Sequence, residues 1–103
     1  MIFRRRFADV VSRQLDLFGR EQAGLIADCD AAERAYDAAP RDEAEERYGD
    51  YLDLVDTGTE ALAELRDGYA ATLEEDATEE YEAAFNRAVA KRFPRFALEI
   101  EDT

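Results

Sequence analysis

Apolar residues recur every three or four positions along most of the chain, a spacing that predicts amphipathic helices. The longest such stripe predicts a helix over residues 42–75, with no proline inside it. A second stripe predicts a long helix over residues 3–37, and a third predicts a shorter helix over residues 77–93. With 103 residues, the chain is expected to form one all-α domain.

The turns between these helices have their own sequence signals. Pro40 blocks continuation of the first helix and predicts a tight turn. Asp42 with Glu45 fits a capping box at the start of the central helix, and Asp76 with Glu79 repeats the pattern before the third. We therefore expect a long antiparallel helical hairpin, with the shorter third helix completing a three-helix bundle at one end.

The first helix has a weak point at Gln22, a polar residue where the stripe requires an apolar one. Gly19 and Gly24 flank it, and each costs a helix about 1 kcal/mol relative to alanine. Any bend or break is expected here. The turn positions also place Gly19 near Gly58, with Phe93 filling the space beside them; the alternative is a small ligand notch.

The predicted third helix ends at the level of Gly19 and Gly58, so only the first two helices continue beyond it. Residues 22–55 of these two helices still carry many apolar side chains. Two helices cannot bury this much apolar surface against each other alone. The surface must be covered by the chain's own tail, by a second copy, or by another protein. We call it the hairpin face, and it comprises Leu25, Ile26, Cys29, Tyr36, Tyr48, Tyr51, Leu52 and Val55.

The C-terminal tail, residues 94–103, is the first candidate cover. Its apolar residues alternate with polar ones at Phe96, Leu98 and Ile100. Alternation of this kind is typical of an extended segment. The tail is therefore a candidate strap that runs along the hairpin face in extended form; the alternative is a flexible end that leaves the face free.

Charge is distributed unevenly along the chain, which has 26 acidic and 13 basic residues and a net charge of −13. So acidic a surface disfavours nucleic acid and anionic membranes as partners. Arg4, Arg5 and Arg6 form a basic patch near the N-terminus. We expect this patch to pair with the acidic cluster at residues 74–82; the alternative is peripheral docking on a membrane surface or a phosphate-bearing partner.

The chain has no histidine and a single cysteine, Cys29. Without histidine, Ser-His-Asp and Cys-His catalytic arrangements are excluded, as are metal sites that combine histidine with carboxylates. Cys29 lies on the apolar stripe of the first helix and is interpreted as a core residue rather than a reactive thiol. We predict no enzymatic activity, no cofactor and no metal site.

The sequence also favours a location and a class of function. No apolar run is long enough for a transmembrane segment and no signal peptide is recognisable, so a soluble cytoplasmic protein is expected. The main hypothesis is a small acidic adaptor or assembly subunit that binds a protein partner, or forms a homodimer, through the hairpin face. The alternative is an acidic regulator that occupies a basic surface on a protein partner.

Overall fold

The computed structural model describes residues 6–97, and the secondary structure of that range is entirely helical. The predicted all-α class is confirmed. Within that range the α-helices and two one-turn 3-10 helices are α1 (Ala8–Glu21), α2 (Ala23–Ala38), η2 (Arg41–Glu43), α3 (Ala44–Ala70), α4 (Glu75–Arg92) and η3 (Pro94–Phe96).

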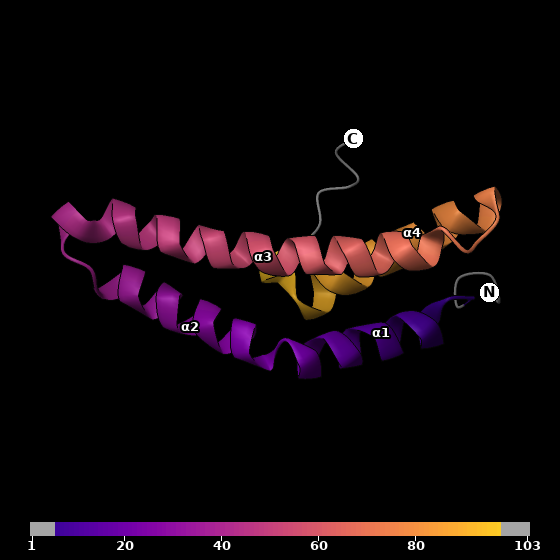
Figure 1. Ribbon diagram of the computed structural model, residues 1–103, viewed down its shortest axis with the longest axis horizontal. Helices are drawn as coiled ribbons and strands as arrows, with labels where there is room; N and C mark the ends of the chain where they lie inside the picture. Colours follow the sequence, from indigo (N-terminus) through magenta and orange to yellow (C-terminus); the bar gives the residue numbers. More distant parts are fainter. Residues whose placement is uncertain (1–5, 98–103) are drawn as a thin grey trace.

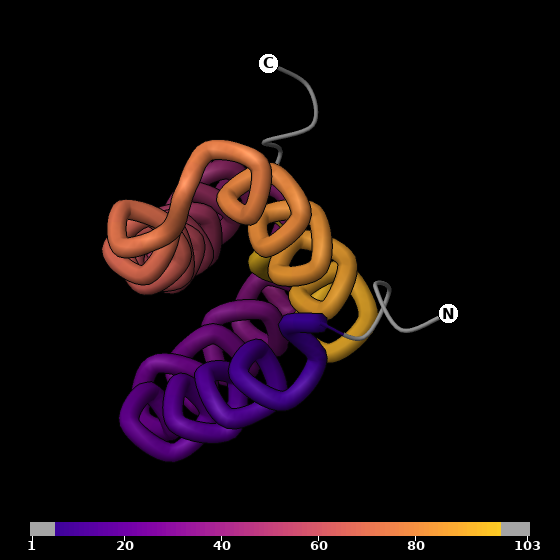
Figure 2. The backbone as a smooth tube through the Cα atoms, turned by 90° about the vertical axis from the view of Figure 1, so that its right-hand side faces the viewer, coloured from indigo at the N-terminus to yellow at the C-terminus, as the bar shows by residue number. Residues whose placement is uncertain are grey.

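The longest helix, α3, forms the axis of the molecule and packs most extensively against α2 (Figure 1). Helix α4 packs against both α1 and α3 at the opposite end (Figure 2). The short helix η3 returns the chain onto α3. The radius of gyration is 15.9 Å, above the roughly 13 Å of a compact domain of this length. The elongation follows from the α2–α3 arm, which extends beyond the part of the core that α4 covers.

The helix predicted over residues 3–37 is divided into α1 and α2 at Gln22, the position where a bend or break was expected. Its backbone leaves the helical region at φ −106° and ψ 22°. Hydrogen bonding continues across the break, since the Gln22 amide donates to the Phe18 carbonyl at 2.8 Å and its own carbonyl accepts from Ile26 at 2.9 Å. The result is a bend, and the break lies where a polar residue interrupts the apolar stripe.

The predicted capping boxes are wrong. Asp42 lies inside η2, and α3 begins two residues later than predicted without a side-chain cap. Helix α3 ends at Ala70 rather than at residue 75, and α4 runs over 75–92 rather than 77–93. The Thr78 hydroxyl donates to the Glu74 carbonyl at 3.1 Å and lies 3.3 Å from the Ala70 carbonyl, so it ties the start of α4 to the end of α3.

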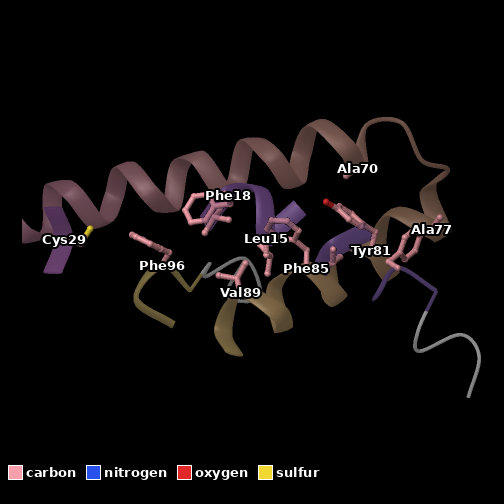
Figure 3. Packing of buried hydrophobic residues seen from close by; sticks show 12 residues of the cluster. Leu15, Phe18, Cys29, Ala70, Ala77, Tyr81, Phe85, Val89 and Phe96 are labelled. Carbon is pink, nitrogen blue, oxygen red and sulfur yellow. The ribbon is translucent and has the colours of Figure 1, made fainter. Parts of the chain in front are cut away.

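The core lies where α1 and α4 meet α3, and its buried side chains point toward one another from the three helices (Figure 3). Tyr81 is fully buried at its centre, and its hydroxyl donates to Gln14 Oε1 at 2.9 Å. The buried guanidinium of Arg66 donates to Asp67 and Asn86. The largest fully buried side chains are Leu15, Leu62, Tyr81, Phe85, Val89, Cys29 and Phe96.

Phe96, rather than Phe93, fills the space beside Gly58. A Cβ atom on Gly58 would lie 2.4 Å from the Phe96 ring, so only glycine admits this packing. Phe93 instead lies against Gly19 and meets Phe18 edge to face at a centroid distance of 5.2 Å. The reason is the turn of η3 after Pro94, which directs the next aromatic residue back onto α3.

The Gly58 contact predicts the effect of a single methyl group. Gly58→Ala should destabilise the protein by about 1–3 kcal/mol, since the overpacking outweighs the gain in helix propensity. Gly68→Ala is the matched control on α3, because a Cβ at Gly68 meets open space; it should stabilise by up to about 1 kcal/mol. Urea unfolding followed by circular dichroism measures both, and equal effects would contradict the packing.

A second prediction concerns pH. Burial raises the pKa of Tyr81 to about 12 from its ordinary value of 10.0, because the phenolate would be desolvated in the core. The unfolded chain therefore loses this proton at lower pH than the folded chain does. The contribution to stability is complete below pH 10 and is lost as pH rises toward 12, on the order of 2–3 kcal/mol at full titration.

Tyr81→Phe removes the titrating group and should flatten the fall in unfolding free energy between pH 10 and pH 12. The variant also loses the Gln14 hydrogen bond, which lowers its stability at every pH. Denaturant unfolding at pH 8, 10 and 11.5 separates the two effects. If the unfolding free energies of wild type and variant fall equally between pH 10 and pH 11.5, the raised pKa of Tyr81 is contradicted.

Candidate functional site

The hairpin face is divided into a covered half and an exposed half. The covered half lies against α1, α4 and η3, and within it Cys29 is completely buried. The other members of the covered half are half-buried, and they are Leu25, Ile26, Tyr51 and Val55. The exposed half lies toward η2 and is named here the tip patch, with exposed fractions of 38% for Tyr36, 44% for Tyr48 and 38% for Leu52.

Helix η3 closes the covered half through Arg95, a residue that the sequence analysis did not single out. Its guanidinium donates to Asp30 at 2.9 Å and to Glu33 at 2.6 Å, both on α2. Its Nε donates to the Tyr51 hydroxyl on α3 at 3.1 Å, and the group lies over the Tyr51 ring. One side chain therefore ties η3 to both helices of the hairpin. The sequence signal for this contact was the i, i+3 spacing of Asp30 and Glu33, which places two carboxylates on the same side of α2.

The apolar part of the strap is Phe96, which is almost fully buried and meets Phe18 edge to face at a centroid distance of 5.8 Å. In Figure 3 the sulfur of Cys29 lies on the side of the core that Phe96 occupies. The extended conformation predicted for residues 94–103 is wrong at η3, which is a helical turn. Leu98 and Ile100 lie outside the described residues.

Cys29 has the environment of a core thiol. Burial raises its pKa, and the nearby Arg95 charge only partly opposes this effect. A raised pKa lowers the thiolate fraction at neutral pH, and the thiolate is the reactive species. The structure therefore gives Cys29 no feature of a nucleophile.

The tip patch combines aromatic and acidic groups. The Tyr36 and Tyr48 rings pack at a centroid distance of 5.1 Å, and Tyr51 continues the row at 6.4 Å from Tyr48. Glu45 and Asp56 lie one turn before Tyr48 and one turn after Leu52, and both are exposed. The patch is therefore an apolar surface with carboxylates at its two ends along α3.

The basic patch is represented among residues 6–97 by Arg6, since Arg4 and Arg5 lie outside that range. The Arg6 guanidinium lies 3.5 Å from a carboxylate oxygen of Glu80, a member of the predicted acidic cluster. Its other face lies over the Phe7 ring. The contact agrees with intramolecular pairing for this one arginine.

A second surface, which the sequence analysis missed, is a groove of about 880 Å³ between α1 and α4. Its floor is apolar and includes Val11, Leu15, Ala84 and Ala88, while Arg87 and Lys91 stand at its edge. The sequence signal for the groove was the i, i+4 spacing of Ala84 and Ala88, next to Arg87 and Lys91 at the same spacing. Because the groove depends on how α1 packs on α4, that signal was not sufficient.

Metal-binding groups and membrane-spanning helices were sought in the part of the chain that the structure describes. Residues 6–97 contain no group of three or more cysteine, aspartate or glutamate side chains placed to hold a metal ion. None of the helices in this range is long and apolar enough to cross a membrane. Comparison with protein-family models, curated proteins and solved structures finds no match.

The strap predicts the reactivity of Cys29. Arg95→Ala removes three hydrogen bonds and should cost about 1–2 kcal/mol, a discounted value because Asp30 and Glu33 are about half exposed. If η3 opens locally, labelling of Cys29 by a thiol reagent should accelerate roughly 5- to 30-fold. Arg34→Ala, an exposed change on the same α2 helix, is the control. Identical labelling rates in all three proteins would show that η3 does not guard the thiol.

Proposed function

We propose that this chain is a small non-enzymatic interaction protein, an adaptor or assembly subunit, that binds another protein chain through the tip patch. The observation that carries the proposal is the selective coverage of the hairpin face. Helix η3 covers the half that contains Cys29, while Tyr36, Tyr48 and Leu52 stay exposed. The proposed binding surface is therefore narrower than the whole hairpin face.

Energetics support this choice of surface. Complete burial of a large apolar side chain stabilises by about 1.5–3 kcal/mol relative to exposure, and each tip residue has already lost part of its exposure. Covering the three would contribute a few kcal/mol, and aromatic residues dominate the energetics of many protein interfaces. The tyrosines suit an interface that is only partly dry, because each hydroxyl can keep a polar partner.

The architecture supports it as well. We interpret the fold as an antiparallel hairpin whose one end is completed by α4, so that the other end serves as a binding arm. The Arg95 contacts fix α2 against α3 near the middle of that arm. A surface held in place before binding loses less conformational entropy on association.

The alternative function, an acidic regulator, has its own supporting observation. The segment at the end of the arm carries exposed carboxylates that follow one another closely, namely Asp42, Glu43, Glu45 and Glu46. A basic surface on a partner would complement them. Binding of this kind weakens steeply with added salt, whereas apolar contact through the tip patch is nearly independent of salt.

Paired variants test the proposal. The double variant Tyr48→Ser and Leu52→Ser should reduce capture of the protein's partners from native lysate by about tenfold or more. Leu17→Ser is the matched control, because Leu17 is a similarly exposed residue on α1, with an exposed fraction of 41%. Capture is quantified by mass spectrometry at low and high salt.

The expected result is that the same partners are lost with the tip variant, kept with Leu17→Ser, and retained at high salt. Capture that survives the tip change but disappears with salt would contradict the proposal and favour the acidic regulator. Light scattering of the purified variants shows in parallel whether one of the partners is a second copy of the chain.

A further inference from the structure

Two surfaces of this protein are complementary to each other. The α1–α4 groove has an apolar floor and cations at its edge. The tip of the hairpin has the opposite arrangement, an apolar centre with carboxylates on both sides. The two surfaces lie at different parts of an elongated molecule, so the tip of one copy cannot contact the groove of the same copy.

The cations of the groove are unusual in a chain with a net charge of −13. Arg92, which also lines the groove, is paired with Asp16 across its edge. Within residues 6–97, neither Arg87 nor Lys91 forms an ion pair. These two residues are four positions apart on α4 and therefore share one side of the helix. Among the residues that the structure describes, no carboxylate compensates these two positive charges beside the apolar floor.

The complementary element is a ridge on α3 formed by Glu45, Tyr48, Leu52 and Asp56. Steps of three, four and four residues place all four on one side of the helix, and all four are exposed. The ridge spans roughly 16 Å at 1.5 Å per residue. The groove edge from Ala84 to Arg92 spans about 12 Å by the same measure, so the apolar centre of the ridge fits within its length.

We propose that this chain associates head to tail, with the α3 ridge of one copy seated in the α1–α4 groove of the next. This inference rests on the proposed function and names the partner as a second copy. Tyr48 and Leu52 would lie on the alanine-rich floor, and the carboxylates would approach Arg87 and Lys91.

Charge favours this arrangement over a symmetric tip-to-tip dimer. Residues 23–56 carry eleven acidic and three basic side chains. Two such arms placed together would repel, and like charges across an interface can cost several kcal/mol. In the head-to-tail contact, the acidic arm meets the part of the molecule that carries exposed cations. Because a pair joined in this way keeps one unused ridge and one unused groove, the contact propagates into a ring or an open chain.

The test uses charge reversal and mixing of the full chain, followed by sedimentation velocity at low salt. Wild type should show an average mass above the 11.7 kDa monomer that grows with concentration. A groove variant, Arg87→Glu with Lys91→Glu, and a ridge variant, Glu45→Lys with Asp56→Lys, should each associate at least tenfold more weakly. All four positions are exposed, so the fold should persist.

Mixing the two variants gives the decisive result. The intact ridge of the groove variant fits the intact groove of the ridge variant, and the two reversed surfaces also carry opposite charges. An equimolar mixture should therefore regain the concentration-dependent mass that each variant alone loses. The four changes combined in one chain should restore association. Gly49→Gln places a bulky side chain on the ridge where a Cβ meets open space, and it should block association, whereas Gly68→Gln should not.

Two outcomes would overturn the inference. One is a wild-type protein that stays monomeric at about 1 mM. The other is a dimer that the groove variant leaves unchanged, which would indicate a symmetric interface. Either outcome leaves the proposed function standing if the tip patch still captures a different protein, so the two claims fail separately.

Discussion

The contact between the Phe96 ring and the bare backbone of Gly58 determines which part of this molecule is core and which part is surface. It brings η3 onto α3 and allows Arg95 to reach Asp30, Glu33 and Tyr51. The α2–α3 pair could not bury its apolar residues alone, and this one turn supplies the missing cover for half of them. What remains exposed is the tip patch, so the limit of the cover also sets the limit of the candidate site.

Electrostatics contributes to the arrangement in a second way. Most of the chain is acidic, and several arginines serve as internal ties, each held by a carboxylate within the same chain. Arg6 meets Glu80, Arg92 meets Asp16, and Arg95 meets two acidic residues of α2. Such pairs at the surface stabilise little individually, about 0–1 kcal/mol, and mainly fix the orientation of elements. The cations that lack such a pair among residues 6–97 include those beside the α1–α4 groove.

The sequence predicted the fold where local periodicity determines it. Helical stripes located each helix, and the polar Gln22 located the break between α1 and α2. The helix starts were mispredicted because Asp42 and Asp76 lie inside helical turns instead of preceding them. The Phe93 assignment failed because the chain direction after Pro94 depends on η3. Arg95 was missed because its partners on α2 lie 62 and 65 positions away in the sequence.

The candidate site was predicted only as a set of apolar residues. Which of them would be covered depended on a turn that periodicity does not encode. The most direct test of the account is therefore the unfolding free energy of a chain ending at Phe93, compared with the full chain. The account predicts a loss of about 3–5 kcal/mol of unfolding free energy, since the truncation removes the buried Phe96 side chain and the hydrogen bonds of Arg95. A difference below about 0.5 kcal/mol, the range of ordinary surface changes, would contradict it.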